Sequence, residues 1–587
     1  MITLPFQDKD PKMRNFFLQQ SRSEYRYNYD LIPPLAISDT VPEAELPKFG
    51  WIFQLLQVGA KLIENSISTK EGIARKFRIV LSSNLFRIRM LVKILFSLSD
   101  PTNFFTSAGE YILKYLRKGE GVLLEEYNDL FKTIEIPRKD RDFLSDENFV
   151  KMRLAGWNPC LIESIDKLPK KLALTDSILR LAKGFKNDSV ESCLKEKRMF
   201  LVDYKDLSFL ENGFQPNGEK FCYAPIAVLA KSKKSNELTL VAIQTGQDSK
   251  KFPIFSTGSD YWAWQMAKAV VNSADGNHHE LISHLGLTHL VTEPFVIATH
   301  RQLSKFHPIF QLLVPHFTGT IFINHLAKTK LIAPNGGVDY LLSGSIQSDV
   351  TVTIQNHLKY GFNDLDFPSQ LKRRKIYDPK ILEYYPYRDD GLLVWNAIQN
   401  WVGSYLNLYY PDNSFITKDY ELELWAKEIV SELGGRVKNF GEDGNGKITT
   451  ISYLTKAITQ IIFTCSAGHS SVNFPQKELM IYAPEVPLGL YDKAPDSGRE
   501  YTEKDYFSML PTLDMASLQL NLGYTLGAIY YTKLGEYKNF EDRKVFSILQ
   551  KFQKELKEIE QVIEERNKNR YSYTFMLPSK ITQSINI

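Results

Sequence analysis

The chain has 587 residues, of which 43% are hydrophobic and 24% charged, and its formal net charge is only +4. This length predicts a large domain with appendages, or several domains, and the composition is that of a soluble globular protein. The small net charge argues against a nucleic acid as partner. No apolar run approaches the ~20 residues that span a bilayer, and the N-terminus lacks the apolar stretch of a signal peptide. Four scattered cysteines without CxxC spacing suit a reducing compartment, so we expect a cytoplasmic protein.

The first 130 residues contain several different patterns. Residues 1–47 are polar and end in proline-containing segments, which predicts that they lie extended over the surface of a larger domain. Residues 50–67 have apolar positions at helical spacing. Residues 72–99 also predict a helix, with six basic residues, no acidic residue and many apolar positions between them. A cationic amphipathic helix of this kind can lie in a membrane interface, or it can pack on the protein's own core with its charges in solvent.

The rest of the chain is mainly helical in pattern. Residues 100–145 predict further helices and a linker. Residues 220–255 contain two strand-like runs separated by a polar turn, which predicts a β-hairpin. After about residue 260 the pattern is one of long helices. The sequence therefore predicts a mainly α fold with a small β element.

Three histidines in a predicted helix that begins near Trp262 are candidate metal ligands: His279, His284 and His289. Residues five apart on a regular α-helix lie ~140° apart, which prevents them from sharing an ion. One inserted residue, a π-bulge, would bring such a pair to the same face, and π-bulges concentrate at functional sites. The spacing does not choose between the first pair and the second, and ordinary core or surface histidines remain the alternative.

Two later segments also carry candidate ligands. His469 and Asn473 are four residues apart, so on a helix they share a face. If that pair is buried it needs a partner, which can be a metal or an ordinary hydrogen bond. The last seven residues, which end at Ile587, carry no charged side chain. If they dock inside the protein, the terminal carboxylate needs a positive partner, and a metal ion is one such partner.

Taken together and in this order, these features resemble the lipoxygenases over roughly residues 140–587. The matching segments are FVKMRLAGWNP (149–159), WQMAK to LLVPH (264–316), YYPYRDDGLLVWNAIQNWV (384–402), HSSVN (469–473) and the terminal SINI. The resemblance implies a lipoxygenase-type helical catalytic domain at 131–587 with a small β-sheet region. Residues 1–130 would form an N-terminal extended and helical segment, as in bacterial and particularly cyanobacterial lipoxygenases that lack the N-terminal PLAT β-barrel.

The resemblance also implies the metal and the reaction. It assigns one non-heme iron to His284, His289, His469, Asn473 and the carboxylate of Ile587, and it leaves His279 as a neighbour. Nitrogen and oxygen ligands suit iron. In the family, a ferric hydroxide takes a hydrogen atom from the methylene between two cis double bonds. O₂, the co-substrate, then traps the radical to give a hydroperoxide of linoleate, linolenate or arachidonate.

Six further residues fall at positions that the family uses for its substrate. The resemblance places five apolar side chains along the substrate channel: Leu331, Val338, Leu341, Leu342 and Leu522. Of these, Leu341 and Leu342 fall where the family sets the depth of the pocket. Ala327 falls at the small-residue position that biases stereochemistry, where alanine usually accompanies S products and glycine R products.

Some positions depart from the family pattern. Glu280 stands where the plant enzymes have a glutamine that links the substrate helix to the shell of Asn473, whereas Gln476, the other member of that link, is retained. The two arginine positions proposed to meet the fatty-acid carboxylate are Ala483 and Leu326 here. The orientation of the substrate is therefore open.

Three other interpretations remain open. The protein could mainly rearrange hydroperoxides with the same ligands, or it could be a catalytically weak lipid-binding or membrane protein. A zinc hydrolase would use Glu280 as general base, but it would give Asn473 and the terminus no role. For the leading interpretation we expect a monomer that takes a polyunsaturated fatty acid or its ester. Residues 72–99 would supply any peripheral membrane contact.

Overall fold

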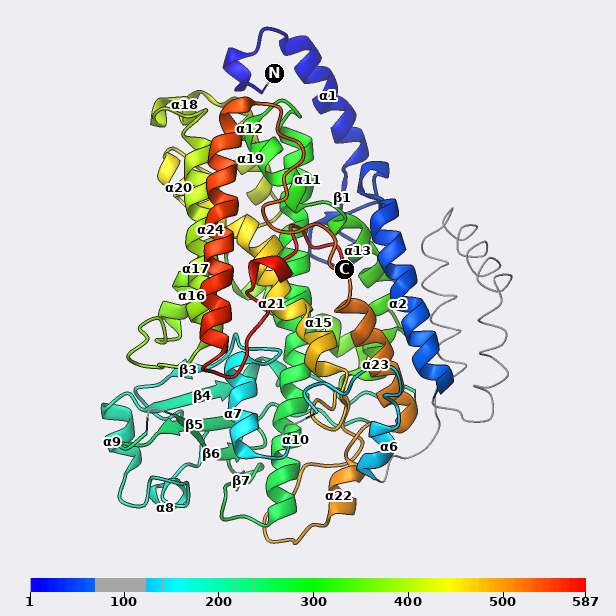
Figure 1. The fold of residues 1–587 in the computed structure, drawn as a ribbon, viewed down its shortest axis with the longest axis vertical. Helices are drawn as coiled ribbons and strands as arrows, with labels where there is room; N and C mark the ends of the chain where they lie inside the picture. The colour runs from blue at the N-terminus through cyan, green and yellow to red at the C-terminus, as the bar shows by residue number, and fades with distance from the viewer. Residues whose placement is uncertain (1, 69–122, 140–141, 217, 236) are drawn as a thin grey trace.

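The computed structural model describes residues 2–68, 123–139, 142–216, 218–235 and 237–587. A tall helical body carries a small β-sheet at one end, and the C-terminus lies within the body beside α2 (Figure 1). This arrangement confirms the predicted mainly α fold with a small β-sheet region. The predicted basic helix at 72–99 lies outside the described residues.

The N-terminal residues form a helix where the sequence predicted an extended segment. Helix α1 (Pro11–Glu24) begins where the Asp10 side chain accepts a hydrogen bond from the Met13 backbone N–H, and Pro11 occupies the first helical position. The prediction was wrong because a contact distant in sequence stabilises this helix. Arg14 is buried and bonds Glu421 of α19 (Tyr420–Val430), 407 residues away, with an Nε–Oε1 distance of 2.6 Å.

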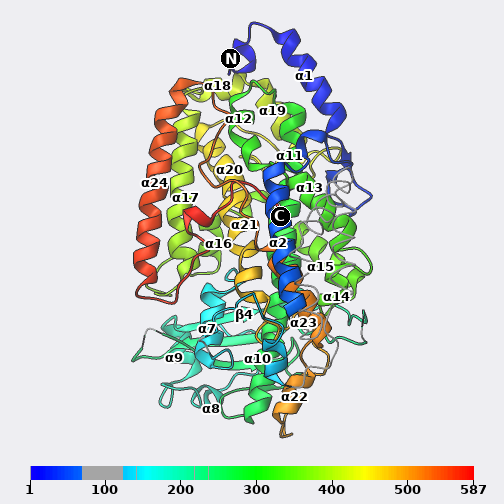
Figure 2. The same ribbon diagram turned by 45° about the vertical axis from the view of Figure 1, so that its right-hand side comes forward.

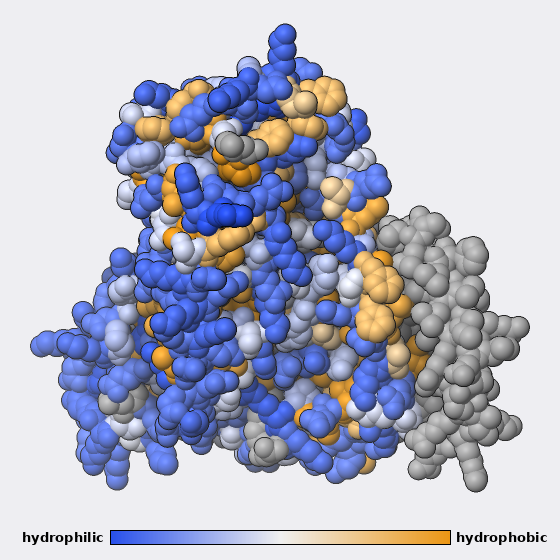
Figure 3. Space-filling model, turned by 45° about the horizontal axis from the view of Figure 1, so that its top comes forward, coloured by the Kyte–Doolittle hydropathy of each residue, from blue (hydrophilic) through white to orange (hydrophobic). Residues whose placement is uncertain are grey.

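Helix α2 (Phe49–Ser68) confirms the helix predicted at 50–67. Its inner face packs on the body, where the Trp51 indole N–H donates to the backbone carbonyl of Asn586 at 2.7 Å. Its outer face carries Phe49 and Phe53, which are 78% and 51% exposed. Figure 3 shows apolar residues gathered on the right-hand part of this face of the molecule.

Residues before 130 share one hydrophobic core with the rest of the body, through side chains such as Leu4, Ile37, Trp51 and Leu62. Two short strands, β1 (Tyr27–Asn28) and β2 (Ile37–Ser38), pair antiparallel between α1 and α2. The predicted division of the chain at residue 130 stays a prediction.

The small sheet packs one face against both α7 (Asp146–Ala155) and the helix that begins at Tyr261. It contains five antiparallel strands in chain order: β3 (Glu163–Ser164), β4 (Met199–Asp203), β5 (Ile226–Lys231), β6 (Leu238–Gln244) and β7 (Ile254–Phe255). Strands β5 and β6 are the predicted hairpin. Because both are buried on two faces, they read as nearly continuous apolar runs in the sequence.

One continuous helix forms the axis of the body and runs from the sheet end to the α1 end (Figure 2). It consists of α10 (Tyr261–His278), a π-helical segment η4 (His279–His289) and α11 (Leu290–Gln302). Among the described residues it is the one helix whose length and apolar composition would allow it to cross a membrane. However, 89% of its most apolar 18-residue window is buried inside the protein. It is the core helix of this fold.

Other helices pack around this axis. On one side are α13 (Thr320–Leu326), η6 (Ala327–Leu331), α14 (Gly337–Leu341), α15 (Ile346–Lys359) and α23 (Leu513–Leu526). On the other are α7 (Asp146–Ala155), α17 (Pro386–Leu406), α20 (Ile451–Phe463), η8 (Thr464–Gly468), α21 (His469–Asn473), η9 (Gln476–Met480) and α24 (Arg543–Asn567). Shorter helices connect them, namely α6 (Leu124–Asn128), α8 (Asp176–Leu179), α9 (Val190–Lys195), α12 (Pro308–Leu313), α16 (Phe367–Arg373), α18 (Asn413–Lys418) and α22 (Glu503–Ser508).

Candidate metal centre and substrate cavity

The middle of the core helix is π-helical over His279–His289, which confirms the insertion predicted from the five-residue spacing. In a π-helix the hydrogen bond runs from i to i+5, so residues five apart come to the same face. His284 and His289 use that alignment to point their rings at one place. A second π-helical segment, η8, ends immediately before His469 and turns this third ring toward the same place.

Three imidazoles converge at this place. The Nε2 atoms of His284 and His289 are 3.1 Å apart, and those of His289 and His469 are 3.2 Å apart. All three side chains are buried. Among the described residues this is the one group of His, Cys, Asp and Glu whose ligand atoms lie close enough to hold a metal ion, all within 4.8 Å. His279 is outside the group, which resolves the choice that spacing left open.

The surroundings of His289 fix which of its nitrogens carries the proton. The Asn324 side chain contacts the Glu293 carboxylate at 2.8 Å, and because a carboxylate only accepts, the amide nitrogen must face Glu293. The amide oxygen then faces the Nδ1 atom of His289, also at 2.8 Å. Nδ1 must therefore carry the hydrogen, which leaves a lone pair on Nε2 at the centre of the cluster.

The protonation of the three rings also favours a metal at their centre. Burial, aided by repulsion from neighbouring histidines, lowers the pKa of all three imidazoles, that of His289 to about 3. They are therefore neutral near pH 7. The Nε2 lone pair of His289 faces the Nε2 atoms of the other two rings at 3.1–3.2 Å, and a cation among the three nitrogens would be bound by all of them. The residues fit a divalent or trivalent metal that prefers imidazole.

Asn473 and Ile587 lie beside this cluster. Asn473 is fully buried one turn after His469, and its amide oxygen accepts a hydrogen bond from the Gln476 side chain at 3.1 Å. Ile587 is 2% exposed, and its backbone lies close enough to His469 to influence the pKa of that ring. No ion pair among the described residues involves the terminal carboxylate. Because a buried carboxylate needs a positive partner, a metal at the histidines would supply it.

His279 and Glu280 contact the cluster from its edge. The Nε2 atom of His279 bonds the backbone carbonyl of Val472, the residue before Asn473. Glu280 lies 3.3 Å from Nδ1 of His279 and 3.7 Å from Nδ1 of His284. Burial raises the pKa of Glu280, but its contacts with His279 and, to a smaller extent, with His284 outweigh burial and lower the pKa to about 2. Glu280 is therefore an anion that orients the ring of His284.

A narrow apolar cavity of about 30 Å³ lies next to Glu280. Six of the sequence-predicted residues line it together: Leu331, Val338, Leu341, Leu342, Gln476 and Leu522. Ala327 is not among its lining residues and begins the π-helical segment η6, which ends at Leu331. The volume holds about two water molecules, so a fatty-acid chain requires this wall to move outward. The anchor positions Leu326 and Ala483 are both buried and apolar.

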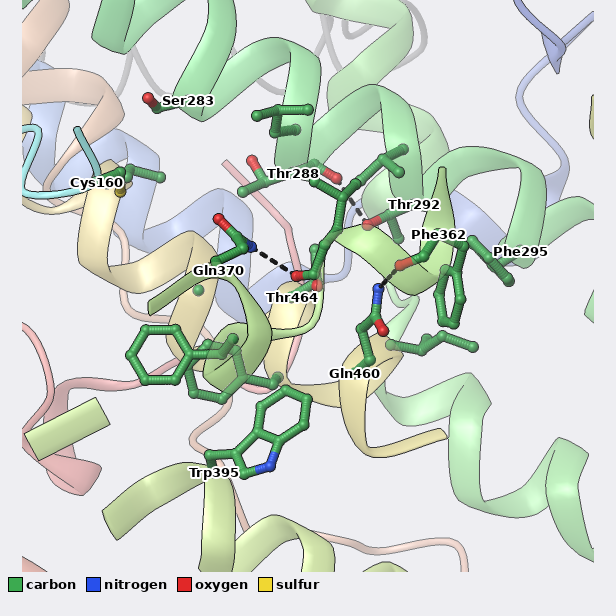
Figure 4. Close-up of a pocket in the computed structure, with 18 of the residues that line it drawn as sticks. Cys160, Ser283, Thr288, Thr292, Phe295, Phe362, Gln370, Trp395, Gln460 and Thr464 are labelled. Atoms are coloured by element: carbon green, nitrogen blue, oxygen red, sulfur yellow. Dashed lines mark hydrogen bonds between the residues drawn. The ribbon is translucent and has the colours of Figure 1, made fainter. Parts of the chain in front are cut away.

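A second cavity, of about 90 Å³, lies on the other side of the histidine-bearing helices (Figure 4). Aromatic side chains such as Phe295 and Trp395 line it. The amide nitrogens of Gln370 and Gln460 are turned to the backbone carbonyls of Leu365 and Phe362. Sequence reasoning missed this cavity because its residues come from helices that are far apart in the chain.

Two buried titratable residues, Lys220 and Asp349, lie near the wall of the first cavity. Lys220 donates to the carbonyls of Asp339 and Tyr340 in α14, at 2.7 and 3.2 Å. Asp349 of α15 is fully buried, and neither of its carboxylate oxygens has a hydrogen-bond partner. Burial raises the pKa of Asp349 to about 8 and lowers that of Lys220 to about 8.

This raised pKa predicts a pH dependence of stability. Because the pKa of Asp349 is about 8 in the folded state but about 3.8 in the unfolded chain, ionisation of this carboxyl destabilises the fold as the pH rises between these values. Asp349→Asn should therefore match the parent's melting temperature at pH 5 and exceed it at pH 8 by at least about 2 °C. Thermal melts of both proteins at the two pH values measure this. Equal melting temperatures at pH 8 would contradict it.

Comparison with known proteins identifies the family. The lipoxygenase family model matches residues 113–576. A linoleate 9/13-lipoxygenase of Pseudomonas aeruginosa is 35% identical over 95% of this chain and 88% of its own length. The human polyunsaturated fatty acid lipoxygenase ALOX15B is 31% identical over 84% of this chain and 75% of its own. The crystal structure of coral 8R-lipoxygenase covers 100% of this chain with 83% of its own, at a TM-score of 0.84 and 25% identity.

The fold is mainly helical, and its buried histidine cluster is one that could hold a metal ion. The chain belongs to the lipoxygenase family, whose members are fatty-acid dioxygenases with non-heme iron. Two residues of the site, Asn324 and Glu293, were not predicted from the sequence. A signal for one of them was present, since Glu293 is the one charged residue in the mainly apolar run LVTEPFVIA (290–298) that follows His289.

Proposed function

We propose that this lipoxygenase oxygenates polyunsaturated fatty acids with one iron held by His284, His289, His469, Asn473 and the Ile587 carboxylate. The observation that carries the proposal is the convergence of three neutral imidazoles beside a buried carboxyl terminus. Iron bound there would supply the one-electron oxidation that removes a hydrogen atom from the methylene between two cis double bonds. Three nitrogens and two oxygens leave one position of an octahedral site open.

The protein's own residues would bind the substrate and exclude water and other radical traps from it. The apolar side chains of the cavity, the five predicted ones among them, would bind the hydrocarbon by removing it from water. The same wall keeps water and other radical traps away from the reacting carbon. No lysine or arginine lines the cavity, so the carboxylate end of the substrate is not held by a basic group there. The substrate class is supported by the two relatives, which are named as lipoxygenases of linoleate and of polyunsaturated fatty acids.

Oxygen uptake and product analysis test this proposal together. The purified, iron-loaded protein should consume O₂ with linoleate or arachidonate and form a conjugated diene that absorbs in the ultraviolet. Oleate, which has no methylene between two double bonds, is the matched control and should give neither signal. An iron-loaded protein that oxidises no polyunsaturated fatty acid, free or esterified, would refute the proposal. Consumption of added hydroperoxide without O₂ uptake would show the rearranging activity instead.

Ala327 predicts the stereochemistry of the product. It begins the π-helical segment that ends at the cavity residue Leu331, and alanine at this position usually accompanies S products in the family. Ala327→Gly should therefore raise the R fraction among the hydroperoxides, because the smaller residue opens space for O₂ at a different carbon. Chiral chromatography of the products from linoleate and arachidonate measures the change. An unchanged ratio of R to S would remove Ala327 from the account.

A further inference from the structure

A buried ion pair lies between the metal site and the wall of the substrate cavity. The ammonium group of Lys328 in η6 is 3.0 Å from the carboxylate of Glu293 in α11, and the two side chains are 4% and 0% exposed. The same carboxylate accepts hydrogen bonds from the backbone N–H of Ser38 at 2.7 Å and from the amide of Asn324 at 2.8 Å. Glu293 therefore has three donors and is fixed in place.

Asn324 transmits the position of Glu293 to His289. Its amide nitrogen donates both to Glu293 and to the backbone carbonyl of His289, at 2.8 and 3.1 Å. Its amide oxygen accepts the ring N–H of the same histidine at 2.8 Å. One side chain thus holds both the main chain and the ring of His289. Any shift of Glu293 changes where the Nε2 lone pair of that ring points.

Lys328 lies on the same short helical segment as a residue of the cavity wall. It is the second residue of the π-helical segment η6, which begins at Ala327 and ends at Leu331. Leu331 lines the substrate cavity, whereas Lys328 reaches inward to Glu293. Because the cavity is only about 30 Å³, a fatty-acid chain must displace wall residues such as Leu331. Movement of η6 then strains the Lys328–Glu293 pair.

We propose that Lys328 and Glu293 are positioning residues that couple occupancy of the substrate cavity to the geometry of His289. This inference rests on the proposed function, because it takes the apolar cavity as the substrate site and the histidine cluster as the iron site. A buried ion pair adds little net stability compared with apolar residues of the same shape, but breaking one partner is costly. A fully bonded polar network is also rigid, so it transmits a displacement that an apolar contact would absorb. Hydrogen-bond partners of metal-bound histidines tune the metal in the same way.

The test uses the ferric holoenzyme and oleate, which can fill the cavity without being oxidised. Oleate should change the electron paramagnetic resonance spectrum of the parent's iron in a saturable way. In Lys328→Met, oleate should still bind, as measured by displacement of a fluorescent fatty acid, but the spectral change should be lost. Lys328→Arg keeps the charge and should restore it. Glu293→Gln should behave like Lys328→Met.

A matched control separates coupling from general damage to the fold. Glu421→Gln removes an equally buried ion pair, with Arg14, at the junction of α1 and α19, and should leave the oleate response intact. A parent spectrum that saturating oleate leaves unchanged would overturn the inference, as would a full response in Lys328→Met. Loss of the response in Glu421→Gln as well would also overturn it. If the parent binds no iron or oxygenates no polyunsaturated fatty acid, the proposed function itself fails.

Discussion

Replacing His469 by alanine should reduce the iron content from about one atom per chain to less than about a tenth, and abolish oxygenation of linoleate. His469 supplies one of three converging imidazoles, and the remaining two lie on one helix segment and cannot enclose an ion. The alanine also leaves the terminal carboxylate of Ile587 without its neighbouring ring. Metal analysis of the purified variant and O₂ uptake with linoleate measure both effects.

A second histidine provides the control for this substitution. His307 is also fully buried, but it bonds Asp419 at 2.9 Å and lies outside the metal cluster. His307→Asn should therefore retain iron and activity even if its melting temperature falls. Circular dichroism should show the parent's helix content in His469→Ala. Normal iron content in that variant would show that the imidazole is not a ligand.

Deletion of Ile587 should have an effect almost as large, with loss of iron and little change in helix content. The tail is fixed upstream of its last residue, since Thr320 donates to the carbonyl of Ile585 and Trp51 to that of Asn586. The shortened chain would end in a carboxylate about 3.5 Å further back along the tail, out of reach of the cluster. Iron content and circular dichroism on the truncated protein measure the two parts of this expectation.

A substitution at Ile587 that keeps the chain length distinguishes the role of the terminal carboxylate from that of the side chain. Ile587→Val keeps the terminal carboxylate in place and removes only one methylene group, so this variant should keep its iron. A truncated protein with full activity would show that the terminus is not a ligand. Loss of iron in Ile587→Val would show instead that packing of the side chain holds the tail.

The sequence predicted the site better than it predicted the N-terminus. The five-residue spacing of His284 and His289 indicated a π-helical insertion because a regular helix would separate them, and the structure contains that insertion. The choice against His279 required the position of His469, which local spacing does not contain. Helix α1 was missed because the contact that stabilises it, between Arg14 and Glu421, joins residues more than 400 positions apart.

The residues around the ligands show the same limit. The resemblance to lipoxygenases named six residues that the structure brings together around one cavity, although their roles there stay predictions. Asn324 and Lys328 were not predicted, because their importance comes from bonds to Glu293 and His289 on a different helix. The role of residues 72–99 at a membrane also stays a prediction.

A crystal structure of the iron-loaded protein, with anomalous data collected on both sides of the iron absorption edge, tests the central claim most directly. We predict one anomalous peak, present above the iron edge and weak below it, bonded to His284, His289, His469, Asn473 and the Ile587 carboxylate. Three results would contradict this prediction: a peak at another place, a peak of equal height on both sides of the iron edge, as another metal would give, or histidines bonded to one another without a metal.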